Sequence, residues 1–431
     1  MTAQPATVSK ANFDRPESDP SFPTLEHEIL ALWEKHDVFK RSIRGDKEFV
    51  FFDGPPFATG TPHYGHLLAG TLKDIVPRYW AMRGYRVERR FGWDTHGLPV
   101  EMEIEKKLNL SGPSAIDAFG IDNYNEACRS IVLRYTSEWR NVVTRMGRWV
   151  DFDDDYKTMD PTFMESVWWV FKALWDKGLL YRGFKVMPYS WRLGTPLSNF
   201  EANMDYRKVQ DPAVTVRLRS TVSLQAMLGE AALADVPADC RGVHPHWLAW
   251  TTTPWTLPSN MGLCVGPKLD YGVYNVAAEG ETPDLVLLGV AAAARVLSED
   301  AEPLVTVSGA KIGRGDLRYE PLFTVPEVPT QAPSGKAVDP YRVVSDGYVT
   351  ADDGTGVVHS APAFGEDDAR VGDQWALPTY DPVDQEGRFS DLLANVAGGK
   401  VVGVHVKEAD KALITDLKAR GLLFKQATID H

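Results

Sequence analysis

The stretch "EFVFFDGPPFATGTPHYGHLLAG", residues 48–70, decides the fold of the N-terminal half. It begins with a short β-prone run that ends at a Gly-Pro-Pro triplet, which predicts a buried strand that leads into a loop. From Gly65 the apolar spacing becomes that of a helix, and Gly84 marks its end. The next run, "YRVERRFGWDTHGLPVE", predicts a second strand that enters a loop at Gly92. Strand, loop, helix and strand form a βαβ unit, so we expect an α/β fold with a parallel sheet and a right-handed crossover.

Two histidines lie where the predicted helix begins. In a parallel α/β sheet, ligands bind beyond the carboxyl ends of the strands, so the loops "DGPPFATGTPHYGH" and "GWDTHGLPVE" are expected to face one crevice. At a helix N-terminus, free backbone N–H groups and the helix dipole favour an anion. His63 and His66 can donate hydrogen bonds there to a phosphate oxygen that gains charge in a transition state, and Gly54, Gly60 and Gly65 let the backbone approach it. The spacing alone leaves open an ordinary helix entry with a capping histidine.

The rest of the chain divides into segments that differ in their pattern of apolar and turn residues. Residues 21–40 have helical spacing, and residues 110–180 are mostly helical, with "ESVWWVFKALWDKG" ending at Lys177 and Gly178. After about residue 208, short β-type runs with turn residues between them predict a β-rich domain that contains the Pro-rich loop "LFTVPEVPTQAPSGKAVDP". The segment "KEADKALITDLKARGLL" predicts a final helix. We therefore expect a helical segment at 1–45, an α/β domain at 46–208, a β-rich domain at 209–405 and a return segment at 406–431.

Composition limits the classes of function. A net charge of −13 argues against a broad basic surface for nucleic acid, although it leaves room for a local groove. No run reaches the roughly 20 apolar residues that a membrane helix needs, and the polar N-terminus predicts no secretory signal. The three cysteines lie far apart and form no CxxC pair, so neither a disulfide framework nor a cysteine zinc site is indicated. These features favour a cytoplasmic protein.

A second group of polar residues lies in the β-rich half. "WTTTPWTLPSN" holds three successive threonines, which are often simply strand residues because threonine is a good β former. About a hundred residues later, "GTGVVHSAPAFGEDD" places His359 and Asp368 nine residues apart. An Asp–His pair suggests general base catalysis, but no serine or cysteine is placed to complete a triad. The residues alone leave both interpretations open.

Several motifs carry a resemblance to a known family. "HYGH" resembles the HIGH signature of class I aminoacyl-tRNA synthetases, with Tyr64 where the signature usually has Ile or Val. The longer stretch "FDGPPFATGTPHYGHLLAGTLKDIVPRYWAMRGYRVERRFGWDTHGLPVEMEIEKKL" and "KVMPYSWRLGTPLSNFEANMDYR" resemble the isoleucyl-tRNA synthetase family, in its eukaryote-like branch. Valyl and leucyl relatives share the histidine signature but not "GWDTHGLPVE" after "DGPP". The resemblance covers essentially the whole chain and implies the first half of a Rossmann-type catalytic domain with an inserted, β-barrel-like editing domain.

The resemblance also implies roles in isoleucine activation. ATP binding is implied for Gly54, His63, Gly65 and His66, with the two histidines on the phosphates, and isoleucine binding is implied for Pro56 and Asp94. Asp94 is expected to hold the ammonium group, and Pro56 to form one wall of the pocket. His96 is either near that pocket or a hydrogen-bonded loop residue. The implied ligands are ATP with Mg²⁺, isoleucine and tRNA(Ile), chiefly its 3′ end. No zinc ligands are evident, and no membrane partner is expected.

For the β-rich half the resemblance implies hydrolytic editing of Val-tRNA(Ile). A pocket around the terminal adenosine and the misattached amino acid is expected to be lined by Thr251, Thr252, Thr253, Thr256 and Asn260. Asp368 is expected to bind the ammonium group of that amino acid, and His359 to shape the pocket against isoleucine. The water is expected to be placed by hydroxyls and backbone rather than by a strong side-chain base. A second pocket is needed because one methylene gives a single site too little discrimination.

The second signature of class I synthetases, KMSKS, has no counterpart in the sequence. We therefore expect an N-terminal fragment with negligible isoleucine-dependent ATP–pyrophosphate exchange, which exposes apolar sheet surface and is poorly soluble. Two alternatives remain. One is a free-standing hydrolase that clears mischarged tRNA, and the other is a non-catalytic module that binds the tRNA 3′ end.

Overall fold

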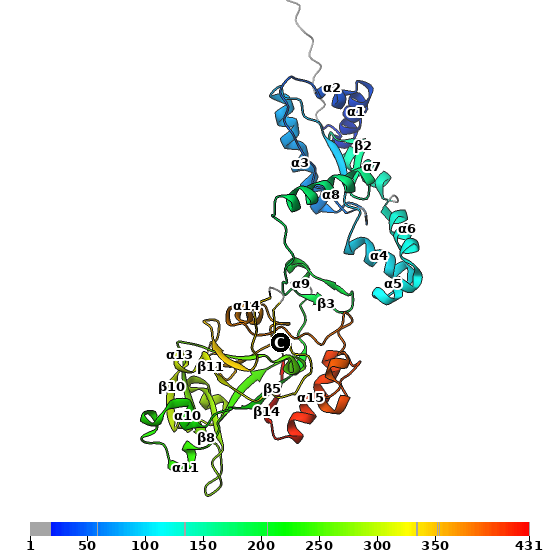
Figure 1. Ribbon diagram of the computed structural model, residues 1–431. Coiled ribbons are helices and arrows are strands. Elements are labelled where there is room, and N and C mark those ends of the chain that lie inside the picture. The colour runs from blue at the N-terminus through cyan, green and yellow to red at the C-terminus, as the bar shows by residue number, and fades with distance from the viewer. Residues whose placement is uncertain are drawn as a thin grey trace, which may run out of the picture. The chain divides into compact units, whose positions relative to one another are not determined.

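The computed structural model describes residues 19–57, 59–132, 135–204, 206–332, 335–350, 352 and 354–430. They form two compact units, Met1–Arg182 and Gly183–His431, which are described separately as unit 1 and unit 2 (Figure 1). The polar N-terminal stretch before Asp19 lies outside the described residues. Within the described ranges no helix is long and apolar enough to cross a membrane. The division of function at residues 45, 208 and 405 stays a prediction.

The described residues of unit 1 are mostly helical, with one parallel pair of strands among them. β1 (Arg90–Trp93) pairs with β2 (Asp151–Lys157). The helices of the unit are α1 (Phe22–Lys35), α2 (Val38–Ser42), α3 (Tyr64–Met82), α4 (Leu98–Leu108), α5 (Pro113–Phe119), α6 (Ile121–Val132), α7 (Thr136–Arg145) and α8 (Pro161–Asp176).

The two long helices of this unit end where glycine was expected to stop them. Gly84, with φ +86°, follows α3, and Gly178, with φ +68°, follows α8. Glycine adopts this left-handed conformation without the clash that a Cβ would cause. The single helix predicted over 21–40 is instead two, because Asp37 adopts φ +47° between α1 and α2.

The first predicted strand of the βαβ unit is not formed as a continuous strand. The extended segment makes isolated parallel bridges only at its two ends, Glu48 with Arg86 and Phe57 with Asp94. Between them the side chain of Phe52 is 85% exposed, and the two prolines that follow have no N–H to donate to a ladder. The second strand does form, as β1, but it continues through Gly92, and the loop begins at Asp94.

β2 was not expected, because four of its seven residues are aspartate, which is depleted in strands. Tertiary contacts outweigh this propensity. The carboxylate of Asp155 accepts a hydrogen bond from the indole N–H of Trp93 on β1 at 2.9 Å. Tyr156 lies over Gly92, where a Cβ would come within 2.2 Å of the tyrosine ring. The Tyr156 hydroxyl donates to the backbone oxygen of Asp53 at 2.7 Å, so β2 is tied both to β1 and to the extended segment.

Exposed apolar side chains of unit 1 lie on its helices and on the extended segment, where Val50 is 63% and Phe52 is 85% exposed. The expected exposed apolar surface is therefore found at the predicted first strand, whereas β1 is covered. Phe91 and Trp93 of β1 are buried because Trp139 and Val143 of α7 pack against them. On α3 and α8, by contrast, large apolar side chains are exposed, and they include Leu68, Leu72, Ile75, Trp168, Trp169, Phe171 and Trp175.

Unit 2 is β-rich, as predicted for this half of the chain. Its strands are β3 (Tyr189–Ser190), β4 (Thr195–Pro196), β5 (Gln210–Arg219), β6 (His246–Thr251), β7 (Gly262–Val265), β8 (Asp270–Asn275), β9 (Leu285–Gly289), β10 (Val305–Ser308), β11 (Arg314–Arg318), β12 (Arg342–Ser345), β13 (Val357–Ser360) and β14 (Leu423–Asp430). Its α-helices are α9 (Asn199–Ala202), α10 (Leu224–Leu228), α11 (Ala238–Arg241), α12 (Ala293–Val296), α13 (Gly309–Ile312), α14 (Glu366–Trp375) and α15 (Val406–Ala419). Short 3₁₀ turns are η1 (Glu230–Leu233), η2 (Pro254–Ser259), η3 (Val290–Ala292), η4 (Asp391–Leu393) and η5 (Val396–Gly399).

Two sheets share one core in this unit. The larger has the strand order β10-β8-β9-β6-β5-β14, and the smaller has the order β11-β12-β7-β13. Trp247 of β6 and Val216 of β5 belong to the same buried cluster as Leu263 of β7 and Val343 of β12. The predicted final helix is α15, and β14 after it returns to pair antiparallel with β5. The described part of the predicted Pro-rich loop forms neither helix nor strand.

Candidate functional site

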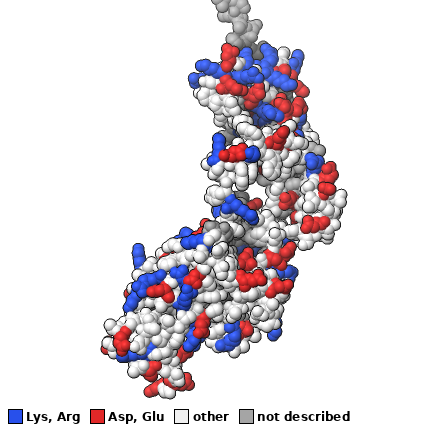
Figure 2. Space-filling model, viewed as in Figure 1, with Lys and Arg blue, Asp and Glu red and all other residues white. Residues whose placement is uncertain are grey.

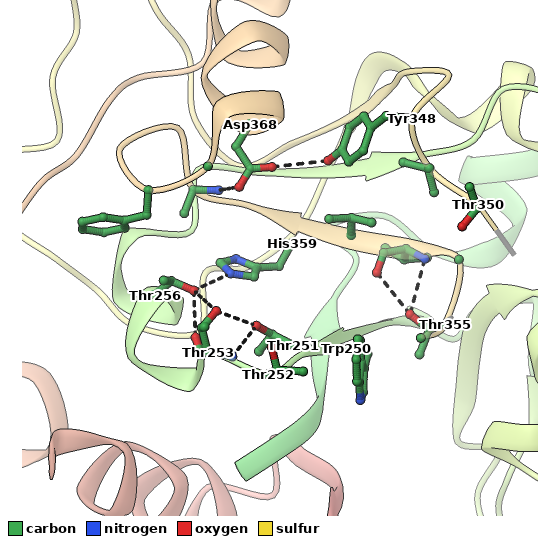
Figure 3. Close-up of a pocket in the computed structure, with 18 residues that line it drawn as sticks. Trp250, Thr251, Thr252, Thr253, Thr256, Tyr348, Thr350, Thr355, His359 and Asp368 are labelled. Carbon is green, nitrogen blue, oxygen red and sulfur yellow. Dashed lines mark hydrogen bonds between the residues drawn. The ribbon is translucent and has the colours of Figure 1, made fainter. Parts of the chain in front are cut away.

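A cavity of about 420 Å³ lies in unit 2 beside the edges of β6 and β13. Figure 3 shows threonines from one wall facing a histidine and a carboxylate from the other. The residues that line it are Trp250, Thr251, Thr252, Thr253, Thr256, Tyr348, Val349, Thr350, Gly354, Thr355, Gly356, Val357, Val358, His359, Ala361, Phe364, Gly365 and Asp368. The structure thus brings six of the seven residues predicted for the editing pocket to one cavity.

The threonine run is only partly a strand. Thr251 ends β6, the backbone bends at Thr252 and Thr253, and Thr256 lies within η2. The hydroxyl oxygens form a ladder: Thr251 Oγ1 lies 3.2 Å from Thr253 Oγ1, which lies 3.3 Å from Thr256 Oγ1. Pro254 suits the start of this tight turn, because the first residue of a helical turn needs no N–H. Three hydroxyls are therefore held along one cavity wall.

His359 is held at both ring nitrogens. Its Nε2 lies 2.8 Å from Thr256 Oγ1, and its Nδ1 lies 3.2 Å from Asn260 Nδ2. The Asn260 amide nitrogen can only donate, so Nδ1 accepts and Nε2 carries the proton that Thr256 accepts. Thr256 in turn donates to the backbone oxygen of Thr253 at 2.8 Å. Burial lowers the pKa of His359 to about 4, so the ring is neutral near pH 7.

Asn260 does not line the cavity, which corrects its predicted place. It is 3% exposed and lies behind His359. Its Nδ2 donates to the backbone oxygen of Gly262 at 3.0 Å as well as to His359, and its Oδ1 accepts from the Tyr319 hydroxyl at 2.6 Å. β7 begins two residues later, at Gly262. Asn260 therefore fixes the position and tautomer of His359.

Asp368 faces the cavity from the first turn of α14. Its Oδ2 accepts from the backbone N–H of Ala361 at 3.0 Å, and its Oδ1 accepts from the Tyr348 hydroxyl at 3.3 Å. Burial raises the pKa of this carboxyl, and the Ala361 N–H opposes the rise. No Lys or Arg among the described residues pairs with it, so the carboxylate is available to a cation in the cavity.

The segment before β13 supplies a wall that sequence reasoning missed. Tyr348, Thr350 and Thr355 line the cavity there. The turn is shaped by Gly356, with φ +75°, whose Cα lies close to Gly289 of the neighbouring sheet. The glycines in "DGTGVV" signalled this turn, but the spacing gave no indication that it faces the threonines. Trp250, the residue before the threonine run, also lines the cavity.

In unit 1, His63 and His66 cap α3. The backbone N–H of Gly65 donates to His63 Nδ1 at 3.1 Å, and that of His63 donates to His66 Nδ1 at 3.3 Å. The two rings stack with their centroids 3.7 Å apart. Burial lowers the pKa of His66, and His63 and Lys73 add to this effect. Both Nδ1 atoms are used as acceptors, which leaves each Nε2 able to donate to an anion.

The loop residues predicted for isoleucine binding lie next to each other. The backbone N–H of Asp94 donates to the oxygen of Pro56 at 2.8 Å. The Asp94 carboxylate accepts from the backbone N–H of His96 at 3.3 Å, which orients it across the turn. His66 lies on Trp139, with 4.8 Å between ring centroids, and Trp139 lies on Trp93 at 5.7 Å. A chain of aromatic contacts therefore connects the helix N-terminus to the strand that precedes Asp94.

A buried carboxylate anchors the glycine-rich loop, and sequence reasoning missed it. Asp53, 6% exposed, pairs with Lys73 of α3 at 2.8 Å and with Arg148. Lys73 also donates to the backbone oxygen of Gly54. Arg148 and His66 line a small cavity of about 60 Å³ next to α3. The aspartate before "GPP" was the available signal, but its two cationic partners are 20 and 95 residues away.

Charges of both signs are interspersed over the face shown in Figure 2. No broad basic area covers that face, as the net charge of −13 predicts. Recognition of a polyanion by this face would therefore depend on local contacts.

The chain is similar to known proteins over most of its length. The family described as "tRNA synthetases class I (I, L, M and V)" matches residues 28–381. The isoleucine–tRNA ligase of Treponema denticola is 46% identical over 426 residues, which cover 95% of this chain and 37% of that protein. The cytoplasmic isoleucine–tRNA ligase of Mus musculus is 46% identical over 419 residues, covering 95% of this chain and 31% of that protein. The chain thus spans about a third of the length of these curated relatives.

One solved structure, titled "The crystal structure of GlLeuRS-CP1", aligns with a TM-score of 0.33 and 13% sequence identity. The alignment covers 49% of this chain and 96% of that one.

Proposed function

Because the chain belongs to the class I tRNA synthetases of the isoleucine, leucine, methionine and valine group, we propose that it carries two sites of an isoleucine–tRNA ligase. Unit 2 holds a hydrolytic site for Val-tRNA(Ile). Unit 1 holds part of the site that activates isoleucine with ATP. The names of the two relatives and their identity of 46% support the choice of isoleucine. The cavity with the threonine ladder, His359 and Asp368 is the observation that carries the hydrolytic part.

In the hydrolytic site Asp368 binds the ammonium group of the misattached valine. Two hydrogen bonds from the protein leave its oxygens with free lone pairs that point into the cavity. This contact fixes the ester carbonyl relative to the threonine wall. A water held by hydroxyls then adds to the carbonyl carbon, the bond to the ribose oxygen breaks, and the proton goes to that oxygen. The products are valine and tRNA(Ile).

His359 acts in this scheme as a wall and not as a base. Its Nδ1 already accepts from Asn260, and its pKa of about 4 makes it a weak base near neutral pH. The clamp at both nitrogens keeps the ring from moving aside for a longer side chain. A rigid wall of this kind admits valine and rejects the additional methylene of isoleucine, which is the discrimination that a second site must add.

In the synthetic site the N-terminus of α3 receives the ATP phosphates. His63 and His66 donate from Nε2, Gly54 and Gly65 line the approach, and Mg²⁺ accompanies ATP. Asp94 binds the ammonium group of isoleucine, with Pro56 at the wall of its pocket. The parallel pairing of β1 with β2 and the parallel bridges at Glu48 and Phe57 support the first half of a Rossmann-type sheet. The two larger sheets of unit 2 then form the editing domain, with tRNA(Ile) entering by its 3′ end.

The test is deacylation of Val-tRNA(Ile) and Ile-tRNA(Ile) by the full chain. We expect hydrolysis of the valyl ester in preference to the isoleucyl ester. The Asp368→Ala variant is expected to lose about 100-fold in rate, because a buried partner of the ammonium group is removed. Asp367→Ala is the matched control, since the neighbouring carboxylate is exposed and pairs with Arg370.

The outcomes separate the alternatives. Equal rates for Asp368→Ala and the unaltered chain would exclude the role of Asp368. Binding of the tRNA 3′ end without turnover would favour the non-catalytic module. Deacylation by the chain without ATP, together with no isoleucine-dependent ATP–pyrophosphate exchange, is the result that we expect.

A further inference from the structure

Asp410 is a buried carboxylate for which the chemistry above has no use. It lies on α15, one turn after Lys407, and only 5% of its surface is exposed. Its Oδ1 has no hydrogen-bond partner within the described residues. Removing a carboxyl group from water is costly unless the protein compensates it, so the contacts of this residue need an explanation.

The element that Asp410 contacts is the turn that carries Thr256. α15 packs against η2, and the backbone N–H of Trp255, in the first turn of η2, interacts with the Asp410 carboxylate. The first N–H groups of a helical turn have no partner within the turn, so the carboxylate supplies an acceptor. Thr256 follows Trp255 directly, and its hydroxyl receives the Nε2 proton of His359.

Asp410 itself does not line the cavity, whereas η2 does, through Thr256. In Figure 3, α15 is the pale red helix below the turn that bears Thr253 and Thr256. We propose that Asp410 is a positioning residue of the hydrolytic site: it holds η2 against α15 and so sets where the Thr256 hydroxyl lies. This inference rests on the proposed function, and Asp410 acts through Thr256 without touching a reacting atom.

Few charges act on this carboxyl group. Burial raises the pKa of Asp410 to about 7, the nearby Lys407 and the Trp255 N–H oppose the rise, and Asp211 of β5 adds to it. Lys407 pairs with Asp211 at 2.8 Å. η2 and η5, which also pack against α15, have no titratable side chain. The other charged groups on the strands that pack against α15 are Arg217, Arg219, Lys425 and Asp430, and the two arginines pair with Asp284 and Glu320.

The position of η2 then depends on pH near neutrality. Above pH 7 the carboxyl group is ionised and accepts more strongly from the Trp255 N–H, so the contact between α15 and η2 strengthens, and protonation below pH 7 weakens it. Asp410→Asn keeps an acceptor oxygen for the Trp255 N–H but carries no charge, whereas Asp410→Ala removes the acceptor. Glu408→Gln removes a charge from the exposed side of the same helix and is the matched control.

The experiment compares initial rates of Val-tRNA(Ile) deacylation by the full chain and these three variants from pH 5.5 to 8.5. At pH 7 we expect Asp410→Ala to be about tenfold slower, the effect of one lost charge-assisted hydrogen bond. Asp410→Asn should match the unaltered chain at pH 6, and the ratio of the unaltered rate to the Asp410→Asn rate should rise several-fold by pH 8.5. Glu408→Gln should follow the unaltered chain throughout.

Full activity of Asp410→Ala would overturn the proposal. A rate ratio that stays constant with pH would overturn it too, because a merely structural carboxyl group leaves the pH profile unchanged. Amide hydrogen exchange at Trp255 and Thr256 separates this proposal from the proposed function. If the unaltered chain does not deacylate, the proposed function fails, and faster exchange in Asp410→Ala but not in Asp410→Asn still supports the positioning of η2. Unchanged exchange in both variants overturns it.

Discussion

The two units fix their candidate catalytic side chains by different means. In unit 2, His359 is buried and held by a run of hydrogen bonds from Tyr319 through Asn260 to Thr256. In unit 1, His63 is exposed and is held by the backbone of the helix that it caps. The first arrangement constrains a ring from all sides, whereas the second constrains it from one. A buried network suits a rigid wall that selects by size, and an exposed cap suits a group that donates to an incoming phosphate.

In unit 1, buried polar residues anchor the loop before the two histidines, whereas the histidines themselves are not buried. Asp53 and its partner Arg148 are almost inaccessible, with 1% and 8% of their side chains exposed. The loop that leads to His63 is therefore anchored at Asp53 and again at Gly60, whose backbone oxygen accepts from the Trp139 indole N–H at 2.6 Å. The contrast between the units predicts that removing a buried partner lowers the free energy of unfolding more, in either unit, than removing the exposed cap.

The largest effect is expected from breaking the anchor of unit 1. Arg148→Met leaves the buried Asp53 carboxylate with Lys73 alone, and we expect a loss of about 3 kcal/mol in the free energy of unfolding. Arg140→Met is the control, because Arg140 pairs with Asp153 on the surface, and its loss should cost less than about 1 kcal/mol. Calorimetry or urea titration measures both. Equal losses in the free energy of unfolding would show that burial of the Asp53–Arg148 pair does not increase its contribution to stability.

The second largest effect is a loss of folding stability at acidic pH. His359 has a folded pKa of about 4, below the unfolded value of about 6.5. The unfolded chain therefore binds more protons between these values, and stability falls as the pH is lowered through this window. At pH 4.5 the loss from this group should be roughly 2.5 kcal/mol relative to pH 7.

Urea titrations of the unaltered chain and of His359→Gln at both pH values isolate this contribution, since all other titrating groups are shared. The variant should lose less stability on acidification by that amount. The same dependence on pH in both chains would show that the ring is not held neutral by burial.

The smallest effect is expected at the exposed cap. His63→Ala removes the acceptor for the Gly65 N–H and should cost about 1 kcal/mol, as for other N-cap losses. His63→Asn should recover most of this, because asparagine is a good N-cap. Tyr64→Ala, which truncates an 89% exposed side chain next to it, is the control. A cost for His63→Ala no larger than that of Tyr64→Ala would mean that the cap does not stabilise α3.

Sequence reasoning succeeded where a local signal decided the outcome. The ends of α3 and α8 followed from Gly84 and Gly178, and most of the cavity in unit 2 followed from two motifs about a hundred residues apart. It failed where distant contacts outweighed local propensity. β2 forms in spite of four aspartates because β1 lies beside it. The extended segment before Pro56 is held by side-chain contacts, such as those of Asp53 with Lys73 and Arg148, and by isolated bridges at its ends rather than by a continuous ladder.

The remaining misses have the same cause. Asn260 lies behind the cavity because its amide group hydrogen-bonds to Gly262, His359 and Tyr319, which spacing does not reveal. Tyr348 reaches Asp368 from 20 residues away, and Asp410 reaches η2 from a helix that is distant in sequence. Such partners are decided by how sheets and helices pack, and a single sequence carries no direct record of that packing.

The contact between Gly92 and Tyr156 restricts which residues fit at position 92. The addition of a single methyl group at residue 92 has no room beneath the ring, and the ring is bonded to the backbone of Asp53. A larger residue at position 92 would therefore displace the Tyr156 ring. Because that ring is bonded to Asp53, the displacement would disturb the loop that leads to His63. Gly92 has no chemistry of its own, yet its missing side chain lets the Tyr156 ring lie over the strand.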